Sequence, residues 1–345
     1  MTKVIITGGL GFIGINTAIR FIEEGIKVVI IDDMSRKGSD INYEYLKDKF
    51  SWKFEFEKVD VRNFKDLCLV FKKHSDAKVV YHLAGQVAVT TSILDPREDF
   101  EINALGTFNV LECIRLYSPD TKIIFSSTNK VYGSMDDKEI IIEDSCYGYE
   151  DMPGGIDENT CLDFHSCYGC SKGSADQYVR DYYRIYGIKS IVLRQSCIYG
   201  TRQLGVEDQG WVAWFTIASM LNKPLTIYGD GMQVRDVLFI DDLVNLYLLL
   251  LDDNKCDGEV FNVGGGPDNT MSLLNLLVYL ENIMGRNIKY SEKNWRPGDQ
   301  KVYISNIDKI RNFTGWYPKI SPKRGVEILS RWVGDNKSII EKVLR

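Results

Sequence analysis

The sequence predicts an α/β fold in which a doubly wound parallel sheet is followed by a smaller C-terminal domain. Short apolar runs alternate with segments of helical apolar spacing up to about residue 200. A glycine-rich stretch joins the first run to the first helix, and the alternation loosens after about residue 200. Uninterrupted apolar strands between amphipathic helices indicate a sheet that is covered on both faces.

Each predicted strand is an apolar run bounded by charged or turn-forming residues. In chain order the strands cover residues 3–8, 27–33, 54–61, 77–85, 121–128 and 188–196. Helices are expected between them, most clearly over residues 12–25, 99–117 and about 170–186. Residues 134–166 break the alternation. An irregular segment of this length is usually functional, so we expect it to form a flap beside the site.

Composition limits the possible functions. The 345 residues are 44% hydrophobic and 26% charged, with a formal net charge of −6, which is typical of a globular protein and does not favour nucleic-acid binding. The longest apolar run, residues 243–252, is too short to span a membrane. The N-terminus leads directly into a strand, so we expect no signal peptide and a cytoplasmic protein. Eight cysteines with one C-x-x-C, Cys167 and Cys170, suit reduced thiols better than zinc, and we expect no metal.

The stretch TGGLGFIG, residues 7–14, follows the first strand and opens the first helix. Gly8, Gly11 and Gly14 permit a tight turn and a close approach of the backbone to a pyrophosphate. The N-terminus of the following helix attracts such an anion. In this strand–turn–helix context the glycines predict a Rossmann-type dinucleotide site.

Asp32 ends the second strand, 18 residues after Gly14. An acid at this place accepts hydrogen bonds from a ribose diol and repels a 2′-phosphate, which favours NAD over NADP. Arg36 and Lys37 leave NADP open, because a nearby cation is able to hold that phosphate. Asp60 and Val61, after the third strand, suit either an adenine contact or an ordinary strand end.

Tyr168 and Lys172 stand four residues apart in YGCSK, so on a helix they share one face. An ammonium near a phenol lowers the pKa of the phenol, and a phenolate near a sugar hydroxyl acts as a general base. Thr128, at the end of the fifth strand, would hydrogen-bond the same substrate oxygen. These residues beside a dinucleotide predict oxidation of an alcohol by hydride transfer.

With these motifs the chain resembles the extended short-chain dehydrogenase/reductases that act on nucleotide sugars, from residue 7 to about Trp316. Further matching stretches are HLAGQ (82–86), NALGTFNVLE (103–112), RDVLFIDDL (235–243) and RPGDQ (296–300). The resemblance implies two domains. An NAD-binding Rossmann domain would comprise residues 1–196 plus about 236–260, and a nucleotide-sugar-binding domain residues 197–235 and 261–345.

The motifs and the resemblance together give the expected site residues. The catalytic residues would be Thr128, Tyr168 and Lys172. The residues expected to contact NAD are Gly8, Gly11, Phe12, Ile13, Gly14, Asp32, Asp33, Ser35, Arg36, Asp60, Val61, Leu83, Ala84, Gln86, Asn103, Tyr168 and Lys172. Those expected to contact the substrate are Thr128, Asn129, Lys130, Gln209, Arg235 and Arg296, of which the two arginines suit a diphosphate.

Asn129 and Lys130 directly follow Thr128. The 4,6-dehydratases of the family carry an Asp-Glu pair there, so the resemblance argues against a dehydratase. A 3,5-epimerising reductase also needs an extra acid and base. His165 and Cys167 are candidates for these roles, although His165 equally suits capping or packing. What remains is an epimerase that oxidises one sugar carbon and then returns the hydride to its other face.

The position of that carbon is suggested by a finer resemblance. The stretches DDMSRKG (32–38), HLAGQVAVTTSI (82–93), SSTNKVYG (126–133), LDFHSCYGCSKGSADQY (162–178) and DQGWVAWF (208–215) are similar to those of epimerases that interconvert CDP-paratose and CDP-tyvelose. The resemblance implies a CDP-sugar substrate, inversion at C2, and a product used in a bacterial surface polysaccharide such as the lipopolysaccharide O-antigen. Cys197 stands where many sugar epimerases have Asn, which argues against the UDP-glucose type. Trp211, Trp214 and Phe215 suit either base contacts or core packing.

Other readings remain open from the sequence. They are an epimerase acting on another nucleotide sugar, for example at C4, a net reductase, and a non-catalytic NAD-binding sensor. Family analogy suggests a homo-oligomer, a dimer or a tetramer, formed through the helices over 99–117 and 168–186. The apolar faces of these helices equally suit covering the sheet.

Overall fold

The structure is a computed structural model that describes residues 2–143, 146–207, 209–296 and 299–344. The chain forms two compact units, each assembled from separated stretches. The first comprises Met1–Val131, Ser166–Arg194 and Val244–Phe261, and the second Tyr132–His165, Gln195–Leu243 and Asn262–Arg345. The assignment of cofactor binding and sugar binding to separate domains stays a prediction.

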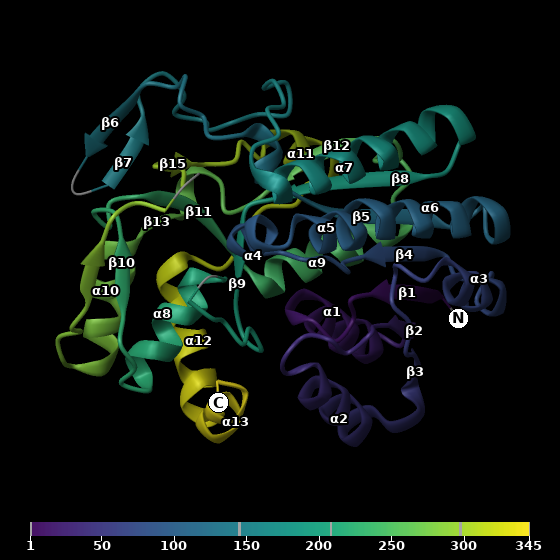
Figure 1. The fold of residues 1–345 in the computed structure, drawn as a ribbon, viewed down its shortest axis with the longest axis horizontal. Coiled ribbons are helices and arrows are strands. Elements are labelled where there is room, and N and C mark those ends of the chain that lie inside the picture. The colour runs from purple at the N-terminus through teal and green to yellow at the C-terminus, as the bar shows by residue number, and fades with distance from the viewer. Residues whose placement is uncertain (1, 144–145, 208, 297–298, 345) are drawn as a thin grey trace. The chain divides into compact units, whose positions relative to one another are not determined.

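The first unit is built on a seven-stranded sheet. Its strands are β1 (Lys3–Thr7), β2 (Lys27–Ile31), β3 (Phe54–Glu57), β4 (Val79–His82), β5 (Lys122–Thr128), β8 (Ser190–Gln195) and β12 (Val260–Val263). They follow the order β12-β8-β5-β4-β1-β2-β3 (Figure 1). The pairs β1–β2, β2–β3, β1–β4 and β4–β5 are all parallel. The order reverses between β1 and β4, which confirms the predicted doubly wound sheet.

Helices cover both faces of this sheet because side chains alternate along each strand. Val80 packs into a core with α3 (Phe64–Lys73), α6 (Gly106–Tyr117) and α7 (Ser166–Tyr186). The neighbouring Tyr81 contacts the rings of Phe21, on α1 (Phe12–Glu23), and Tyr247, on α9 (Ile240–Asp252). The predicted helix over 99–117 begins earlier, as α5 (Pro96–Phe100), and continues through a π-helical turn (Glu101–Leu105) into α6.

The described residues of the second unit form short strands, three longer helices and two shorter ones. Strand β11 (Val234–Phe239) pairs with β9 (Cys197–Tyr199), β13 (Thr270–Ser272) and β15 (Val302–Tyr303). Strand β10 (Thr226–Tyr228) pairs with β14 (Ser291–Lys293). The helices are α8 (Trp211–Met220), α10 (Leu273–Met284), α12 (Pro322–Asp335) and the shorter α11 (Asp308–Thr314) and α13 (Lys337–Val343). The sequence did not predict these elements individually.

The segment 134–166, which we expected to be irregular throughout, contains a hairpin. Strands β6 (Ile140–Glu143) and β7 (Cys146–Tyr149) pair in antiparallel fashion, while residues 144–145 of this segment lie outside the described residues. The hydroxyl of Tyr149 donates to the carbonyl of Val302. The apolar alternation of this hairpin is short and mixed with acidic residues, which hides it from periodicity analysis.

Candidate active site

The predicted cofactor residues of the first unit gather at one edge of its sheet. The strand registers set Thr7 opposite Ile31 and His82, and Ile31 opposite Glu57. The carboxyl ends of parallel strands therefore meet at a common edge, which is where ligands bind in doubly wound sheets. The glycine loop, Asp32, Asp60, Ala84 and Thr128 all lie at or just after these strand ends.

The glycine loop is shaped so closely that two of its glycines exclude any side chain. Gly8 has φ +66°, and a Cβ atom there would lie 2.7 Å from the backbone nitrogen of Ala84. A Cβ atom on Gly14 would lie 2.2 Å from the carbonyl oxygen of Gly8. Helix α1 begins after Gly11 with no side-chain cap and no acidic residue in its first turn. This helix N-terminus therefore fits the diphosphate of a dinucleotide.

Asp32 lies directly after β2 and is buried. Its carboxylate accepts the backbone N–H groups of Leu10 (3.0 Å) and Met34 (2.8 Å). Burial raises the pKa of Asp32, and these two hydrogen bonds act in the opposite direction. The two bonds fix the orientation of the carboxylate next to the glycine loop. A carboxylate has further lone pairs, which leaves Asp32 able to accept a ribose hydroxyl.

Asp60 pairs with Arg62, two residues further along the chain. The Nη2 atom of Arg62 lies 2.7 Å from the carboxylate of Asp60, and the backbone N–H of Arg62 donates to it at 2.8 Å. Burial raises the pKa of Asp60, but the hydrogen bonds from Arg62 outweigh it, so the pKa falls. This pairing favours the reading of Asp60 as a strand-ending residue. Val61 is buried beneath Gly106 of α6, where a Cβ atom would lie 2.7 Å from the Val61 side chain.

Tyr168 and Lys172 both lie in the first two turns of α7. The backbone N–H of Tyr168 donates to the Ser92 hydroxyl, and its phenol hydrogen-bonds the Thr128 hydroxyl. Burial raises the pKa of Tyr168 to about 12, the bond with Thr128 lowers it, and the charge of Asp99 raises it. The shift is opposite in direction to the lowering that the sequence predicts, because desolvation is the largest influence on this phenol.

Lys172 is buried on the same face of α7. Its ammonium group donates to the carbonyl oxygen of Ser126 at 2.6 Å and lies 4.3 Å from the centre of the Phe125 ring. Burial lowers the pKa of Lys172 to about 8, while the charges of Asp176 and Asp99 raise it. The carbonyl and the two acids keep this ammonium group fixed and largely protonated at neutral pH.

A buried hydrogen-bond chain connects the end of β1 with the π-helical turn. The Thr107 hydroxyl donates to the Asn103 carbonyl at 2.6 Å, so it must accept the bond from Nε2 of His82 at 2.9 Å. Nδ1 of His82 then carries no proton and accepts from the Thr7 hydroxyl at 2.7 Å. Burial, together with the charge of Lys172, lowers the pKa of His82 to about 3. His82 is therefore neutral and held as a single tautomer.

Asn103 lies in the π-helical turn and holds the loop after β4. Its Oδ1 accepts the backbone N–H of Gln86 at 2.9 Å, and its Nδ2 lies 3.1 Å from the Gln86 carbonyl oxygen. A Cβ atom on Gly85 would lie 3.0 Å from Asn103 Oδ1 and 3.9 Å from Lys172 Nζ. The structure thus brings Asn103 and Lys172 to the same short loop. Turns of this rare helix type often occur at functional sites.

The predicted substrate residues Gln209, Arg235 and Arg296 lie in the second unit. The Nη2 atom of Arg235 donates to the Gln300 carbonyl at 2.6 Å and to the Asp299 carboxylate at 3.2 Å. The guanidinium of Arg296 lies 3.9 Å from the centre of the Tyr228 ring. Gln209 exchanges two backbone hydrogen bonds with Val206.

This unit also contains a cavity of about 470 Å³. It is lined by residues of the flap and by residues that follow β14 in the chain: Ser134, Met135, Asp136, Lys138, Ile140, Tyr149, Trp295, Asp299, Lys301 and Val302. On α8, Phe215 is buried and belongs to the core, whereas Trp211 and Trp214 are half-buried.

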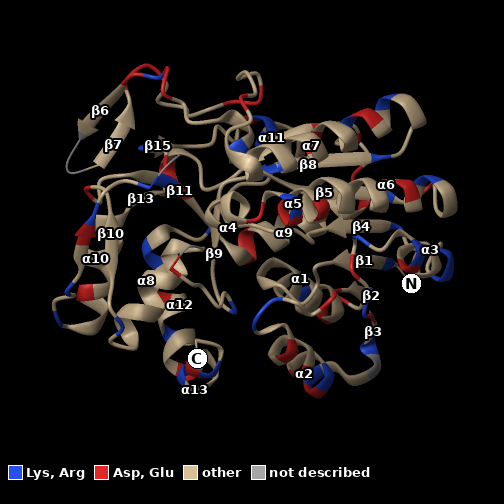
Figure 2. Ribbon diagram, in the orientation of Figure 1, with Lys and Arg blue, Asp and Glu red and all other residues tan. Residues whose placement is uncertain are grey.

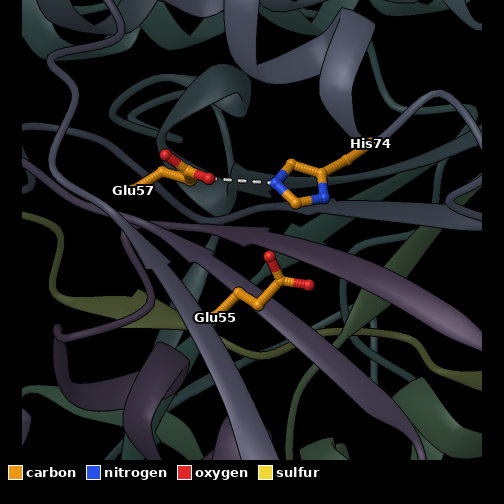
Figure 3. Close-up of side chains that lie close together, drawn as sticks. All are labelled: Glu55, Glu57 and His74. Atoms are coloured by element: carbon orange, nitrogen blue, oxygen red, sulfur yellow. Dashed lines mark hydrogen bonds and ion pairs between the residues drawn. The ribbon is translucent and has the colours of Figure 1, made fainter.

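His165 is exposed, and neither Cys167 nor Cys170 takes part in a disulfide. Among the described residues, one set of three places possible metal ligands within 4.8 Å of one another: Glu55, Glu57 and His74 (Figure 3). Lys73 Nζ lies 2.6 Å from Glu57 and 3.4 Å from Glu55, and His74 lies 3.0 Å from Glu57. A lysine already balances these carboxylates, so we assign no metal to them.

The charges of the first unit are mixed. Figure 2 shows acidic and basic residues interspersed along α3, α6 and α7. Among the helices of the described part of the chain, none has the length and apolar composition that crossing a bilayer requires.

Three sequence motifs could have revealed more of the site. Asp99, four residues before Asn103, shares its helix face, Ser171 adjoins Lys172, and His82 ends an apolar strand. None of these residues was predicted from the sequence as a site residue, because a polar residue at such a position is common without a role.

Comparison with known proteins agrees with the fold. Residues 5–329 match the GDP-mannose 4,6 dehydratase family. A CDP-paratose 2-epimerase of Salmonella typhi is 44% identical over 336 residues, which cover 96% of this chain and 98% of that protein.

Two solved structures are also similar. UDP-glucose 4-epimerase of Thermotoga maritima, with UDP-glucose, has a TM-score of 0.84 at 29% identity, covering 97% of this chain and all of that one. UDP-glucuronic acid 4-epimerase of Bacillus cereus, in complex with UDP-glucuronic acid and NAD, has a TM-score of 0.83 at 28% identity, covering 97% and 99%. The fold, the site and these relatives define an enzyme of the extended short-chain dehydrogenase/reductase class. Within that class, the chain belongs to the GDP-mannose 4,6 dehydratase family.

Proposed function

We propose that the chain is an NAD-dependent epimerase that interconverts CDP-paratose and CDP-tyvelose by inversion at C2 of the sugar. One observation carries the proposal. Thr128, which hydrogen-bonds the buried Tyr168, is followed by Asn129 and Lys130, where a dehydratase needs carboxyl groups. The chain carrying this arrangement is 44% identical, over 96% of its length, to a CDP-paratose 2-epimerase. In the same proposal the product serves a bacterial surface polysaccharide.

The cofactor would lie along the carboxyl edge of the first unit's sheet. The closely packed glycine loop fits its diphosphate, and Asp32 accepts from its adenosine ribose. Arg235 and Arg296 of the second unit would hold the diphosphate of the substrate, because guanidinium groups match phosphate oxygens. Arg235 would then exchange the Asp299 carboxylate for the phosphate.

NAD held by the glycine loop and Asp32 would supply a hydride acceptor for C2 of the sugar and, once reduced, a hydride donor to the opposite face of the same carbon. Tyr168 takes the proton of the C2 hydroxyl and gives it back after the sugar has turned, so no net oxidation occurs. Thr128, bonded to the same phenol, would hold the C2 oxygen. The pKa of this buried phenol is about 12, so the phenol must lose its proton before it serves as a base. The ammonium group of Lys172, one helical turn away on α7, would stabilise the phenolate.

The test uses the purified protein with CDP-paratose and no added NAD. The proposal predicts slow equilibration with the C2 epimer, followed through the coupling of the C2 proton by NMR. Extraction of the protein should release NAD in about equal molar amount. An unchanged sugar in a sample shown to contain NAD would refute the assigned substrate.

A second candidate is epimerisation at C4 of another nucleotide sugar, which the TM-score of 0.84 to UDP-glucose 4-epimerase favours. The same experiment with UDP-glucose and UDP-glucuronic acid distinguishes the two. Inversion of either UDP-sugar, with CDP-paratose unchanged, would select the second candidate.

We also propose that copies of the chain associate through α6 and α7 into a dimer or a tetramer. These helices expose apolar side chains of Leu105, Leu116, Tyr178, Tyr183, Ile185 and Tyr186 at or next to their surfaces. Light scattering after size-exclusion chromatography measures the mass directly, and Ile185→Glu should shift it toward that of one chain. A native protein with the mass of one chain would contradict this.

A further inference from the structure

Asp99 lies on α5 and is completely buried, yet the reaction above does not use it. Its Oδ1 accepts from Gln86 Nε2 at 2.8 Å and from Asn103 Nδ2 at 3.1 Å. Its Oδ2 accepts from the Ser171 hydroxyl at 2.5 Å. The three donors come from the loop after β4, from the π-helical turn and from α7. One carboxylate therefore ties together three segments around Tyr168 and Lys172.

The donors to Asp99 are neutral, which separates it from the other buried acid near Lys172. Asp176 receives a two-pronged bond from Arg194, at 3.0 and 3.1 Å, as well as the Ser127 hydroxyl. Its charge is thus balanced by a guanidinium. The cation that acts on Asp99 is Lys172. Burying a carboxylate among neutral donors is costly unless a nearby cation offsets its charge.

The charge of Asp99 reaches both catalytic side chains. It raises the pKa of Lys172, which favours the ammonium form, and it raises the pKa of Tyr168, which opposes the phenolate. Burial raises the pKa of Asp99, and its three hydrogen-bond donors and the charge of Lys172 limit that rise. Further charged or titratable groups near this pair are Asp176 on α7, which also acts on Lys172, Arg194 on β8, which pairs with Asp176, and His82 on β4, whose pKa Lys172 lowers.

We propose that Asp99 is a positioning residue that holds Gln86 and Asn103 against Ser171 of α7 and, together with Asp176, places negative charge near Lys172. The proposal rests on the proposed function, because Tyr168 and Lys172 gain their roles from it. Asp99 acts through these two residues and does not touch the reacting sugar. It thereby sets the pH range in which Tyr168 accepts a proton.

The test compares Asp99→Asn with the matched control Glu98→Gln, which removes the same charge from an exposed neighbour on the same helix. The measurement is kcat/KM for CDP-paratose as a function of pH. Asp99→Asn removes a negative charge near the Tyr168 phenolate, which is also negative. The acidic limb of its profile should therefore move to lower pH by about one unit, whereas the limb of Glu98→Gln should stay in place. A purely structural role would lower the rate at every pH without moving the limb.

A third variant protects the test against a folding defect. Asp99→Glu keeps the charge but displaces the carboxylate, so it should lose rate and keep the native limb. If the limb of Asp99→Asn stays in place while its circular dichroism is native, the proposal is overturned. The proposal is also overturned if the acidic limbs of the Asp99→Glu and Asp99→Asn profiles move by the same amount.

A readout without turnover separates this proposal from the function. In protein labelled with ¹³C at the tyrosine ring carbon that bears the hydroxyl, the Tyr168 signal is assigned by its loss in Tyr168→Phe. At the same alkaline pH, Asp99→Asn should contain more phenolate at Tyr168 than the native protein. If Asp99→Asn contains more phenolate at Tyr168 but the native protein does not convert CDP-paratose, the assigned substrate is wrong and the role of Asp99 still stands.

Discussion

The Nε2 atom of His82 lies 2.9 Å from the Thr107 hydroxyl oxygen, and that hydroxyl donates to the Asn103 carbonyl. The two contacts require a proton on Nε2 and none on Nδ1. A charged imidazole would need a second acceptor at Nδ1, where the Thr7 hydroxyl already accepts the N–H groups of Leu83 and Ala84. The end of β1 and the turn that carries Asn103 are therefore joined only while His82 is neutral.

Acid should destabilise the protein through His82. Burial lowers the pKa of His82 from 6.5 to about 3, so between these values the unfolded chain binds a proton that the folded chain does not. Stability from this group is therefore complete above pH 6.5 and is lost as the pH falls toward 3, by up to about 1.4 kcal/mol per pH unit. Urea unfolding at a series of pH values measures the slope. His82→Gln should have a smaller slope, and an equal slope would contradict the assignment.

Two substitutions of His82 separate its two bonds. The Gln side chain reaches the Thr107 hydroxyl, and the shorter Asn side chain reaches only the Thr7 hydroxyl. If the bond to Thr107 positions Asn103, His82→Gln should retain more of the native kcat than His82→Asn. Steady-state rates at one pH, with both proteins shown to bind NAD, make the comparison. A higher kcat for His82→Asn than for His82→Gln would show that the hydrogen bond to Thr7 contributes more than the bond to Thr107.

Tyr168→Phe should abolish turnover while leaving the cofactor bound. The proposed function assigns the proton transfer to this phenol, and a positioned general base contributes about 10²–10⁴-fold to the rate. The comparison uses kcat and the NAD content of the purified proteins. Tyr317→Phe, which changes an exposed tyrosine of the second unit, is the control and should behave as the native protein. A Tyr168→Phe protein of near-native rate would remove this residue from the mechanism.

Arg194→Met should destabilise the first unit strongly. Arg194 and Asp176 are almost completely buried, so loss of the guanidinium leaves an unpaired carboxylate, at a cost of about 3–5 kcal/mol. The free energy of unfolding in urea measures this cost. The double variant with Asp176→Leu should recover a large part of it, since no charge is then left unpaired. A single variant within about 1 kcal/mol of the native protein would show that water reaches the site.

Gly14→Ala should lose the cofactor more completely than Gly11→Ala. The added methyl group would lie 2.2 Å from the Gly8 carbonyl in the first case and 3.2 Å in the second, a distance that a small shift relieves. Equilibrium titration with NAD of both purified proteins tests the order. Equal affinities would mean that the loop opens when the dinucleotide binds.

Much of the fold follows from local patterns. Each apolar run of the first unit that was predicted as a strand forms one, and the glycine loop and Tyr168–Lys172 are recognisable within a few residues of chain. Strand β12 was missed because a four-residue apolar run far along the chain carries no sign of its partner β8.

The roles of Asp99 and His82 were also hidden from the sequence. Their partners are Gln86, Asn103, Ser171, Thr7 and Thr107, which come together only when the sheet and its helices are assembled. The direction of the Tyr168 shift was misjudged for the same reason, since desolvation depends on everything packed around the ring.

The edge position of β12 has a consequence for synthesis on the ribosome. The first unit holds residues 1–131, yet its sheet is complete only when residues 260–263 have been made and have emerged. Until then β8 presents an unpaired edge, which is a template for pairing with other chains. A nascent chain stalled before residue 260 should therefore depend on chaperones, whereas the same chain extended past β12 should become resistant to protease in its N-terminal half.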